Sequence, residues 1–168
     1  IWKNCMLGLE IQKSITKEKI AYANHLLKEY NLWDSRNKKP HELSGGMRQR
    51  AALIRTLVLN PDLFLLDEPF SALDFQTRIE VSEDIASIIK KSGKTIILIT
   101  HDLQEAICLS DRILVLSNRP AHVLKEVPVH LTCEGSGILA KRAAPEFNDY
   151  FNELWGDLKG KEIQYVVQ

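Results

Sequence analysis

The chain has 168 residues, of which 45% are hydrophobic and 26% are charged, and its 22 lysines and arginines balance 22 aspartates and glutamates. This composition is typical of a globular domain that buries a core without disulfides or a structural metal. A formal net charge of zero argues against binding nucleic acid or anionic lipid through bulk charge, although it is compatible with a local basic patch.

The cysteines Cys5, Cys108 and Cys133 are far apart and fit no metal-ligand spacing, which favours a reducing compartment. No run of residues approaches the roughly 18 apolar residues of a membrane span, and the N-terminus lacks the pattern of a signal peptide. The first residue is Ile1 rather than methionine, so we expect this chain to be part of a longer protein.

The sequence pattern in the first third of the chain predicts helices. Thr16 is expected to cap a helix that runs to about Tyr30, and residues 31–42 are expected to form a loop. A second helix is predicted over Gly46–Asn60, ended by Pro61.

From residue 63 the pattern alternates between strands and helices. Strands are predicted at Leu63–Leu66, Thr95–Thr100 and Arg112–Leu116, with helices at Phe75–Lys91 and Asp102–Ser110. The strands are too apolar to face water, so this order predicts a parallel sheet between layers of helices.

The last part of the chain has a different pattern of predicted elements. Residues 121–130 predict one or two edge strands, and residues 131–137 predict a loop. An amphipathic helix is expected over Pro145–Lys159, and its apolar stripe is expected to pack on the sheet.

Acidic and imidazole groups follow the ends of two predicted strands. Asp67 and Glu68 follow the first strand, and His101 and Asp102 follow the second. In parallel sheets ligands bind beyond the carboxyl ends of the strands. Asp67 is therefore a candidate to hold Mg²⁺, usually through water, and Glu68 a candidate to orient and deprotonate an attacking water. Alternatively, the two carboxylates cap the following turn and helix, and His101 is an ordinary hydrogen-bonded histidine.

A glycine pair precedes the helix that follows residue 46. Ser44, Gly45 and Gly46 allow close approach of the backbone to a ligand, and a helix N-terminus favours phosphate. Arg48 and Arg50 add positive charge nearby. The structural alternative is an ordinary glycine turn with a serine cap.

Four segments taken together resemble the ATP-binding cassette (ABC) ATPases: LSGGMRQR at 43–50, LFLLDEP at 63–69, SALD at 71–74 and ITHD at 99–102. The resemblance extends over most of residues 1–130. It implies an α/β fold like that of the P-loop NTPases, in which helices flank a parallel sheet and a helical subdomain is attached. On this basis we expect a helical subdomain with the signature motif at 1–60, an α/β core at 61–130, and a C-terminal loop and helix at 131–168.

The resemblance also implies cofactors and roles. ATP and Mg²⁺ are the expected cofactors, with Asp67 as the Walker B magnesium ligand, Glu68 as the general base and His101 as a contact to the γ-phosphate. Ser44, Gly45 and Gly46 would contact ATP held mainly by a second ABC ATPase subunit, in a head-to-tail dimer. Asp74 would belong to the D-loop at that dimer interface.

One motif of the family is missing from the sequence. A P-loop needs the pattern GxxxxGK[ST] between a strand and a helix. Gly93-Lys94-Thr95 does not fit, because Ile88 stands where the first glycine is needed and the triplet leads into a strand. We therefore interpret the chain as roughly the C-terminal two-thirds of a cassette and expect it to lack tight ATP binding and ATPase activity by itself.

Segments outside the four motifs resemble a narrower group within the family. Residues 100–123, the EVPV segment at 126–129 and the terminal helix look like the ATPase subunits of bacterial nitrate, sulfonate and taurine importers. Our main hypothesis is a peripheral ATPase subunit on the cytoplasmic face of the membrane, which drives a transmembrane permease docked on the first 45 or so residues. The alternatives are a truncated or degenerate cassette that binds partners without ATPase activity, and a soluble ABC ATPase outside transport. No nucleic acid partner is expected.

Overall fold

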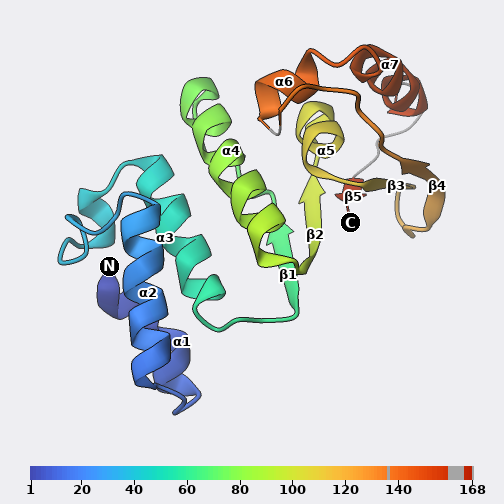
Figure 1. The fold of residues 1–168 in the computed structure, drawn as a ribbon. Helices are drawn as coiled ribbons and strands as arrows, with labels where there is room; N and C mark the ends of the chain where they lie inside the picture. Colours follow the sequence, from blue (N-terminus) through green and yellow to red (C-terminus); the bar gives the residue numbers. More distant parts are fainter. Residues whose placement is uncertain (136, 159–164, 168) are drawn as a thin grey trace. The chain divides into compact units, whose positions relative to one another are not determined.

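The computed structural model describes residues 1–135, 137–158 and 165–167 (Figure 1). The chain divides into two compact units. A helical unit comprises residues 1–62 and 72–81, and a sheet unit comprises residues 63–71 and 82–168. Helix α4 (Phe75–Ser92) begins in the helical unit and ends in the sheet unit. The three-part division expected from the sequence stays a prediction.

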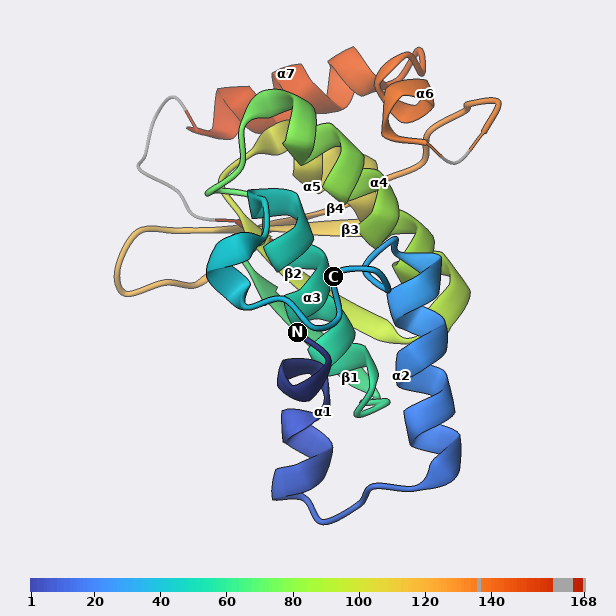
Figure 2. The same cartoon turned by 90° about the vertical axis from the view of Figure 1, so that its left-hand side faces the viewer.

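Three helices of the helical unit pack against one another (Figure 2): α1 (Trp2–Ile11), α2 (Lys17–Glu29) and α3 (Gly45–Leu57). The Thr16 hydroxyl accepts a hydrogen bond from the Lys19 backbone N–H at 3.3 Å, as expected for the cap of α2. A short 3₁₀ turn (Pro40–Glu42) lies in the region predicted as a loop. The core of this unit is apolar and includes Met6, Leu9, Leu27, Ile54 and Val58.

The first helix was not among the predicted elements. Ile1 occupies its N-cap position without a side-chain hydrogen bond, and the first turn carries no acidic residue. Sequence reasoning depends on such start signals, so their absence hides α1. The helix is held by packing instead. Cys5, Met6 and Leu9 are buried, and a Cβ added at Gly8 would lie 2.9 Å from Leu59 Cδ2.

Among the residues that the structure describes, the sheet unit contains five strands in the order β1-β2-β5-β3-β4. These are β1 (Leu63–Asp67), β2 (Thr95–Thr100), β3 (Arg112–Leu116), β4 (Val123–Pro128) and β5 (Tyr165–Val167). β1 and β2 are parallel, and β5 runs antiparallel to both β2 and β3. The strands β1, β2 and β3 therefore share one direction, as predicted. The sheet as a whole is mixed rather than parallel, because β4 returns in a hairpin and β5 enters from the end of the chain.

The sheet unit also contains α5 (Leu103–Leu109), α6 (Ile138–Arg142), α7 (Phe147–Leu158) and the later turns of α4. α5 packs on β2, and α6 and α7 pack on α5. The expected edge strand appears as β4, whereas α6 was not predicted. Lys159, the expected end of the terminal helix, lies outside the described residues. The apolar stripe of α7 packs only in part, because Leu154 is fully buried while Trp155 is exposed.

The first strand departs from the sequence prediction. An unbroken apolar run indicated a strand covered on both faces, yet Leu65 is 70% exposed and Leu63 is also exposed. Phe64, on the opposite face, is buried. Alternate side chains of a strand point to opposite faces, so one face of β1 is packed and the other is open.

Among the described residues, none of the helices has the length and hydrophobicity that crossing a membrane would require.

Candidate functional site

Neighbouring strand ends bring Glu68 and His101 together. β1 and β2 pair in parallel register, with Asp67 opposite Ile99, so the residues that follow each strand emerge at the same edge of the sheet. There His101 Nδ1 lies 2.7 Å from Glu68 Oε1. The structure thus joins two of the residues singled out from the sequence, and Asp67 precedes this pair at the end of β1.

The backbone at Glu68 adopts an unusual conformation. Its φ is 45°, in the left-handed region that glycine favours. A non-glycine residue held there costs about 1–3 kcal/mol unless its surroundings fix it. Here the Glu68 N–H donates to the Ile99 carbonyl at 2.8 Å, and its own carbonyl accepts from the Ser71 N–H at 3.3 Å and from the Ser71 hydroxyl at 3.0 Å. These bonds hold the turn that carries the Glu68 side chain.

The carboxylate of Glu68 raises the pKa of His101. The hydrogen bond to Glu68 is the main cause, burial partly opposes it, and the negative charges of Glu68, Glu105 and Asp102 add to it. The His101 side chain is 69% exposed, so solvent screens these effects. With a neutral ring, the Nδ1–H donates to the carboxylate, because an ionised carboxylate can only accept. This leaves Nε2 as the ring atom for a second partner.

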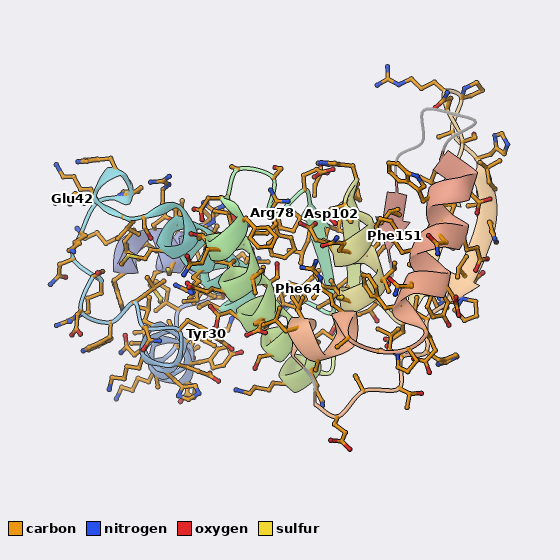
Figure 3. All side chains as sticks on the ribbon, turned by 90° about the horizontal axis from the view of Figure 1, so that it is seen from above. Tyr30, Glu42, Phe64, Arg78, Asp102 and Phe151 are labelled. Atoms are coloured by element: carbon orange, nitrogen blue, oxygen red, sulfur yellow. The ribbon has the colours of Figure 1, made fainter. Side chains whose placement is uncertain are left out.

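Asp102 has a structural role. Its Oδ1 accepts from the backbone N–H groups of Gln104 at 2.8 Å and Glu105 at 3.3 Å, so it caps α5 (Figure 3). Glu105, which sequence reasoning did not single out, accepts a hydrogen bond from the Thr100 hydroxyl at 2.6 Å. The spacing of Asp102 and Glu105 matches that of a capping box, and this was the available signal.

The carboxylate of Asp67 is the candidate magnesium ligand. It is exposed at the end of β1. No group of three or more His, Cys, Asp or Glu residues could hold a metal ion within the part of the chain that the structure describes. Mg²⁺ commonly uses one or two carboxylates together with substrate phosphates and water. A single exposed carboxylate fits such a shared site, in which nucleotide oxygens complete the coordination.

The turn before α3 holds the second predicted group, in the helical unit. The Ser44 hydroxyl accepts from the Met47 N–H at 3.2 Å and so caps the helix. A Cβ added at Gly46 would lie 2.8 Å from Thr77 Cγ2 and 3.1 Å from Val81 Cγ2. Gly46 is therefore needed for the close approach of α3 to the first turns of α4. These observations match the structural alternative, and they are equally compatible with a helix N-terminus that faces phosphate.

Asp74 lies in the same unit, just before α4. Its Oδ1 accepts from the Thr77 N–H at 3.1 Å, and its Oδ2 accepts from the Thr77 hydroxyl at 2.7 Å. These hydrogen bonds lower the pKa of Asp74. The preceding residue, Leu73, places Cδ2 3.2 Å from the position a Cβ would take at Gly45. The segment at residues 71–74 and the turn at Ser44–Gly46 are therefore neighbours.

Known proteins are similar to this chain in sequence and in fold. The family model described as ABC transporter matches residues 3–71, which include Ser44, Asp67 and Glu68. The chain is 45% identical over 166 residues to the uncharacterized ABC transporter ATP-binding protein YtlC of Bacillus subtilis (strain 168), covering 98% of this chain and 63% of YtlC. It is 36% identical to the nitrate import ATP-binding protein NrtD of Synechocystis, covering 96% of this chain and 62% of NrtD.

Further similarity extends to an importer subunit and a solved structure. The taurine import ATP-binding protein TauB of Rhizobium johnstonii is 36% identical, covering 96% of this chain and 64% of TauB. A solved ABC transporter of the metal-chelate type, in an inward-facing conformation, superposes with a TM-score of 0.63 at 21% identity, over 76% of this chain and 51% of that one. The chain thus spans 62 to 64% of the curated relatives described here. In sequence and in fold, it belongs to the ABC transporter family of ATP-binding proteins.

Proposed function

We propose that this chain carries the hydrolytic residues of the ATPase subunit of a membrane importer. The observation that supports this most directly is the 2.7 Å contact between Glu68 and His101 on neighbouring strand ends, immediately after Asp67. Glu68 is a half-buried acid on a strained turn, and it is paired with an exposed histidine at the ligand-binding edge of a sheet. This arrangement suits chemistry better than packing.

Each residue of this group has a proposed task. Glu68 orients a water molecule and accepts its proton, which makes the water oxygen nucleophilic. His101 is held by Glu68 through Nδ1. In the protonated ring, which Glu68 favours by raising the pKa of His101, the Nε2–H can donate to the γ-phosphate. Asp67 holds Mg²⁺ together with the phosphates of bound ATP. When bound, ATP supplies the phosphoryl group and Mg²⁺ offsets the negative charge of its phosphates.

The signature turn and the D-loop are proposed to act on a second ABC ATPase subunit. Ser44 is exposed and Gly45 is partly so, at the N-terminus of a 13-residue helix, where N–H groups favour an anion. We place these residues, with Gly46, against ATP that the second subunit mainly binds, in a head-to-tail dimer. The adjacent Asp74 would lie at the dimer interface.

The helical unit is proposed to dock a transmembrane permease at the cytoplasmic face of the membrane. Its exposed apolar side chains Leu7, Ile11 and Ile15 are spaced four residues apart, and Ile11 is 73% exposed. A cavity of about 770 Å³ in the same unit is lined in part by Trp2, Leu7 and Trp33. Exposed apolar surface beside a cavity suits an apolar partner segment.

The proposed cargo is a small solute that bears an anionic group, such as nitrate, a sulfonate or taurine. Relatives of the chain are named for nitrate import, taurine import and formylaminopyrimidine import. The first two names support a solute with an anionic group, and the third widens the set of relatives to a neutral heterocycle.

The test measures ATP hydrolysis by the chain as it stands and by the chain joined to the coding sequence upstream of Ile1. We expect activity only in the longer protein, because a P-loop lysine and its backbone cradle are needed to hold the phosphates. Glu68→Gln in that protein is expected to lower turnover by about 10²–10⁴-fold while ATP still binds.

Glu80→Gln is the matched control, since Glu80 is an exposed glutamate on α4, outside the proposed site. It should leave turnover unchanged. Equal turnover with and without Glu68→Gln would remove Glu68 from the mechanism. Micromolar ATP binding by the present chain alone would contradict the expectation that it depends on additional sequence.

A further inference from the structure

A second cavity lies in the sheet unit, away from the Glu68–His101 pair. Its volume is about 880 Å³, and its lining comes from the last turns of α4, the ends of α5 and α6, and the loop before α6. α4 ends at Ser92, shortly before β2 begins, and α5 ends at Leu109, shortly before β3 begins. The cavity is therefore at the amino ends of these strands, whereas His101 follows the carboxyl end of β2.

The cavity is positively charged. Lys90, Lys91, Lys94 and Lys141 line it, against only two acidic residues, Glu83 and Asp111. Four positive charges and two negative ones leave an excess of two, in a chain whose formal net charge is zero. Basic groups gathered around a concave surface focus the field and attract anions.

Parts of this lining are fixed in place. The Lys141 ammonium donates to the Cys108 carbonyl at 2.6 Å, which ties α6 to the end of α5. Lys94 is half-buried directly after Gly93, whose φ of 62° ends α4. The triplet Gly93-Lys94-Thr95 is thus not a P-loop, but it does place its lysine on this cavity.

Neutral groups add hydrogen-bonding capacity. The hydroxyl-bearing Ser87 lines the cavity beside the lysines. Gly135, with a φ of 117° that side chains rarely adopt, and Gly137 contribute backbone without side chains. Lysine ammonium groups, a hydroxyl and open backbone are groups that commonly bind phosphate.

We propose that this cavity binds a small soluble anion that bears two or more phosphate groups. Its volume lies within the roughly 300–1,000 Å³ typical of small-molecule sites. A small ion with a single charge, such as nitrate, would leave most of this space to water. A diphosphate matches both the size of the cavity and the spread of its positive charge.

The test titrates the chain with sodium pyrophosphate at constant ionic strength and follows backbone amide shifts by NMR. We expect saturable shifts at Lys94, Gly137 and Lys141, and none at Gly45 and Gly46. Sodium sulfate at the same ionic strength should bind at least about tenfold more weakly, because it bears fewer charges. Shifts confined to Gly45 and Gly46 would assign the phosphate to the start of α3 and overturn the proposal.

Two sets of variants separate the cavity from bulk charge. Lys90→Gln with Lys94→Gln should weaken pyrophosphate binding about tenfold or more. Lys13→Gln with Lys17→Gln removes the same charge from exposed positions of the helical unit and should change binding little. Equal losses in the two pairs would mean non-specific attraction, contrary to the proposal.

A third variant blocks the cavity without changing its charge. Ser87→Phe places a ring on the lining and should abolish the amide shifts, while helical circular dichroism reports whether the chain still folds. Undiminished binding by a folded Ser87→Phe protein would overturn the proposed location. None of these measurements depends on ATP hydrolysis, so their outcome is independent of the proposed transport function.

Discussion

The turn at Glu68 and the turn at Ser44 carry equally recognisable motifs, yet the structure explains them differently. At the second turn, Ser44 caps a helix and Gly46 makes room for Thr77 and Val81, so folding by itself accounts for these residues. At the first turn, Glu68 has a left-handed backbone, and its side chain bonds an exposed histidine. A residue that costs folding energy without filling a core points more directly to function than one that folding requires.

Enlarging Gly46 is expected to have the largest effect on stability. Gly46→Val should lower the free energy of unfolding of the helical unit by about 3 kcal/mol, because even its Cβ would lie 2.8 Å from Thr77 Cγ2. Urea denaturation followed by circular dichroism measures this. Gly156→Ala on α7 is the matched control. No atom lies within 4 Å of its added Cβ, so it should stabilise by about 0.5–1 kcal/mol.

A second change tests the contact itself. Thr77→Ser removes the Cγ2 that meets Gly46 but keeps the hydroxyl that Asp74 accepts from. Gly46→Ala should therefore cost less in the Thr77→Ser background than in the native one. Equal costs in the two backgrounds would show that Thr77 is not the neighbour that requires glycine at this position, which leaves the contact with Val81 Cγ2 at 3.1 Å.

Backbone strain at Glu68 gives the next largest expected effect. Glu68→Gly should be more stable than Glu68→Ala by about 1 kcal/mol, because glycine adopts a φ of 45° without steric penalty and alanine does not. The comparison cancels the loss of the hydrogen bond to His101, which both variants share. Thermal unfolding of the two variants provides the measurement.

Glu80 is the control position for this experiment, because the order of stability of its two variants is expected to be reversed. It lies within α4, where glycine is less favourable than alanine, so Glu80→Gly should be less stable than Glu80→Ala by about 1 kcal/mol. If the order at Glu68 matched the order at Glu80, the left-handed conformation would carry no strain, and the contrast between the two turns would lose its physical basis.

Sequence reasoning recovered the elements whose signals are local. The strand at Thr95–Thr100 and the Thr16 cap follow from short patterns, and the first strand ends at Asp67, one residue beyond the predicted Leu66. The pairing of β1 with β2 then brings Glu68 to His101. It missed α1, which starts without a capping residue. It also missed the placement of β5 between β2 and β3, because that pairing joins segments distant in the chain.

The conformation of Glu68 opposes its local sequence. A residue before proline favours extended backbone, and Pro69 follows Glu68, yet the φ of Glu68 is 45°. The bonds that impose it come from Ile99 on another strand and from Ser71 beyond the proline. The exposure of Leu65 is similar, since an apolar run shows hydrophobicity but not which of its faces meets a neighbour. Both features are set by tertiary contacts, which local patterns do not contain.

The smallest expected effect concerns the charge of His101. Its pKa is raised above 6.5, chiefly by the hydrogen bond to Glu68, so Glu68→Gln should lower it toward that value in an NMR titration of the imidazole. Because the folded pKa is the higher one, this bond stabilises the fold fully below about pH 6.5, and its contribution is lost as pH rises through the folded pKa. Glu105→Gln is the control. It removes only a more distant charge and should lower the pKa less than Glu68→Gln does. An equal or larger shift with Glu105→Gln would mean that the summed negative charge at this edge of the sheet, rather than the paired carboxylate, sets the pKa of His101. Glu68 and His101 would then not act as a unit.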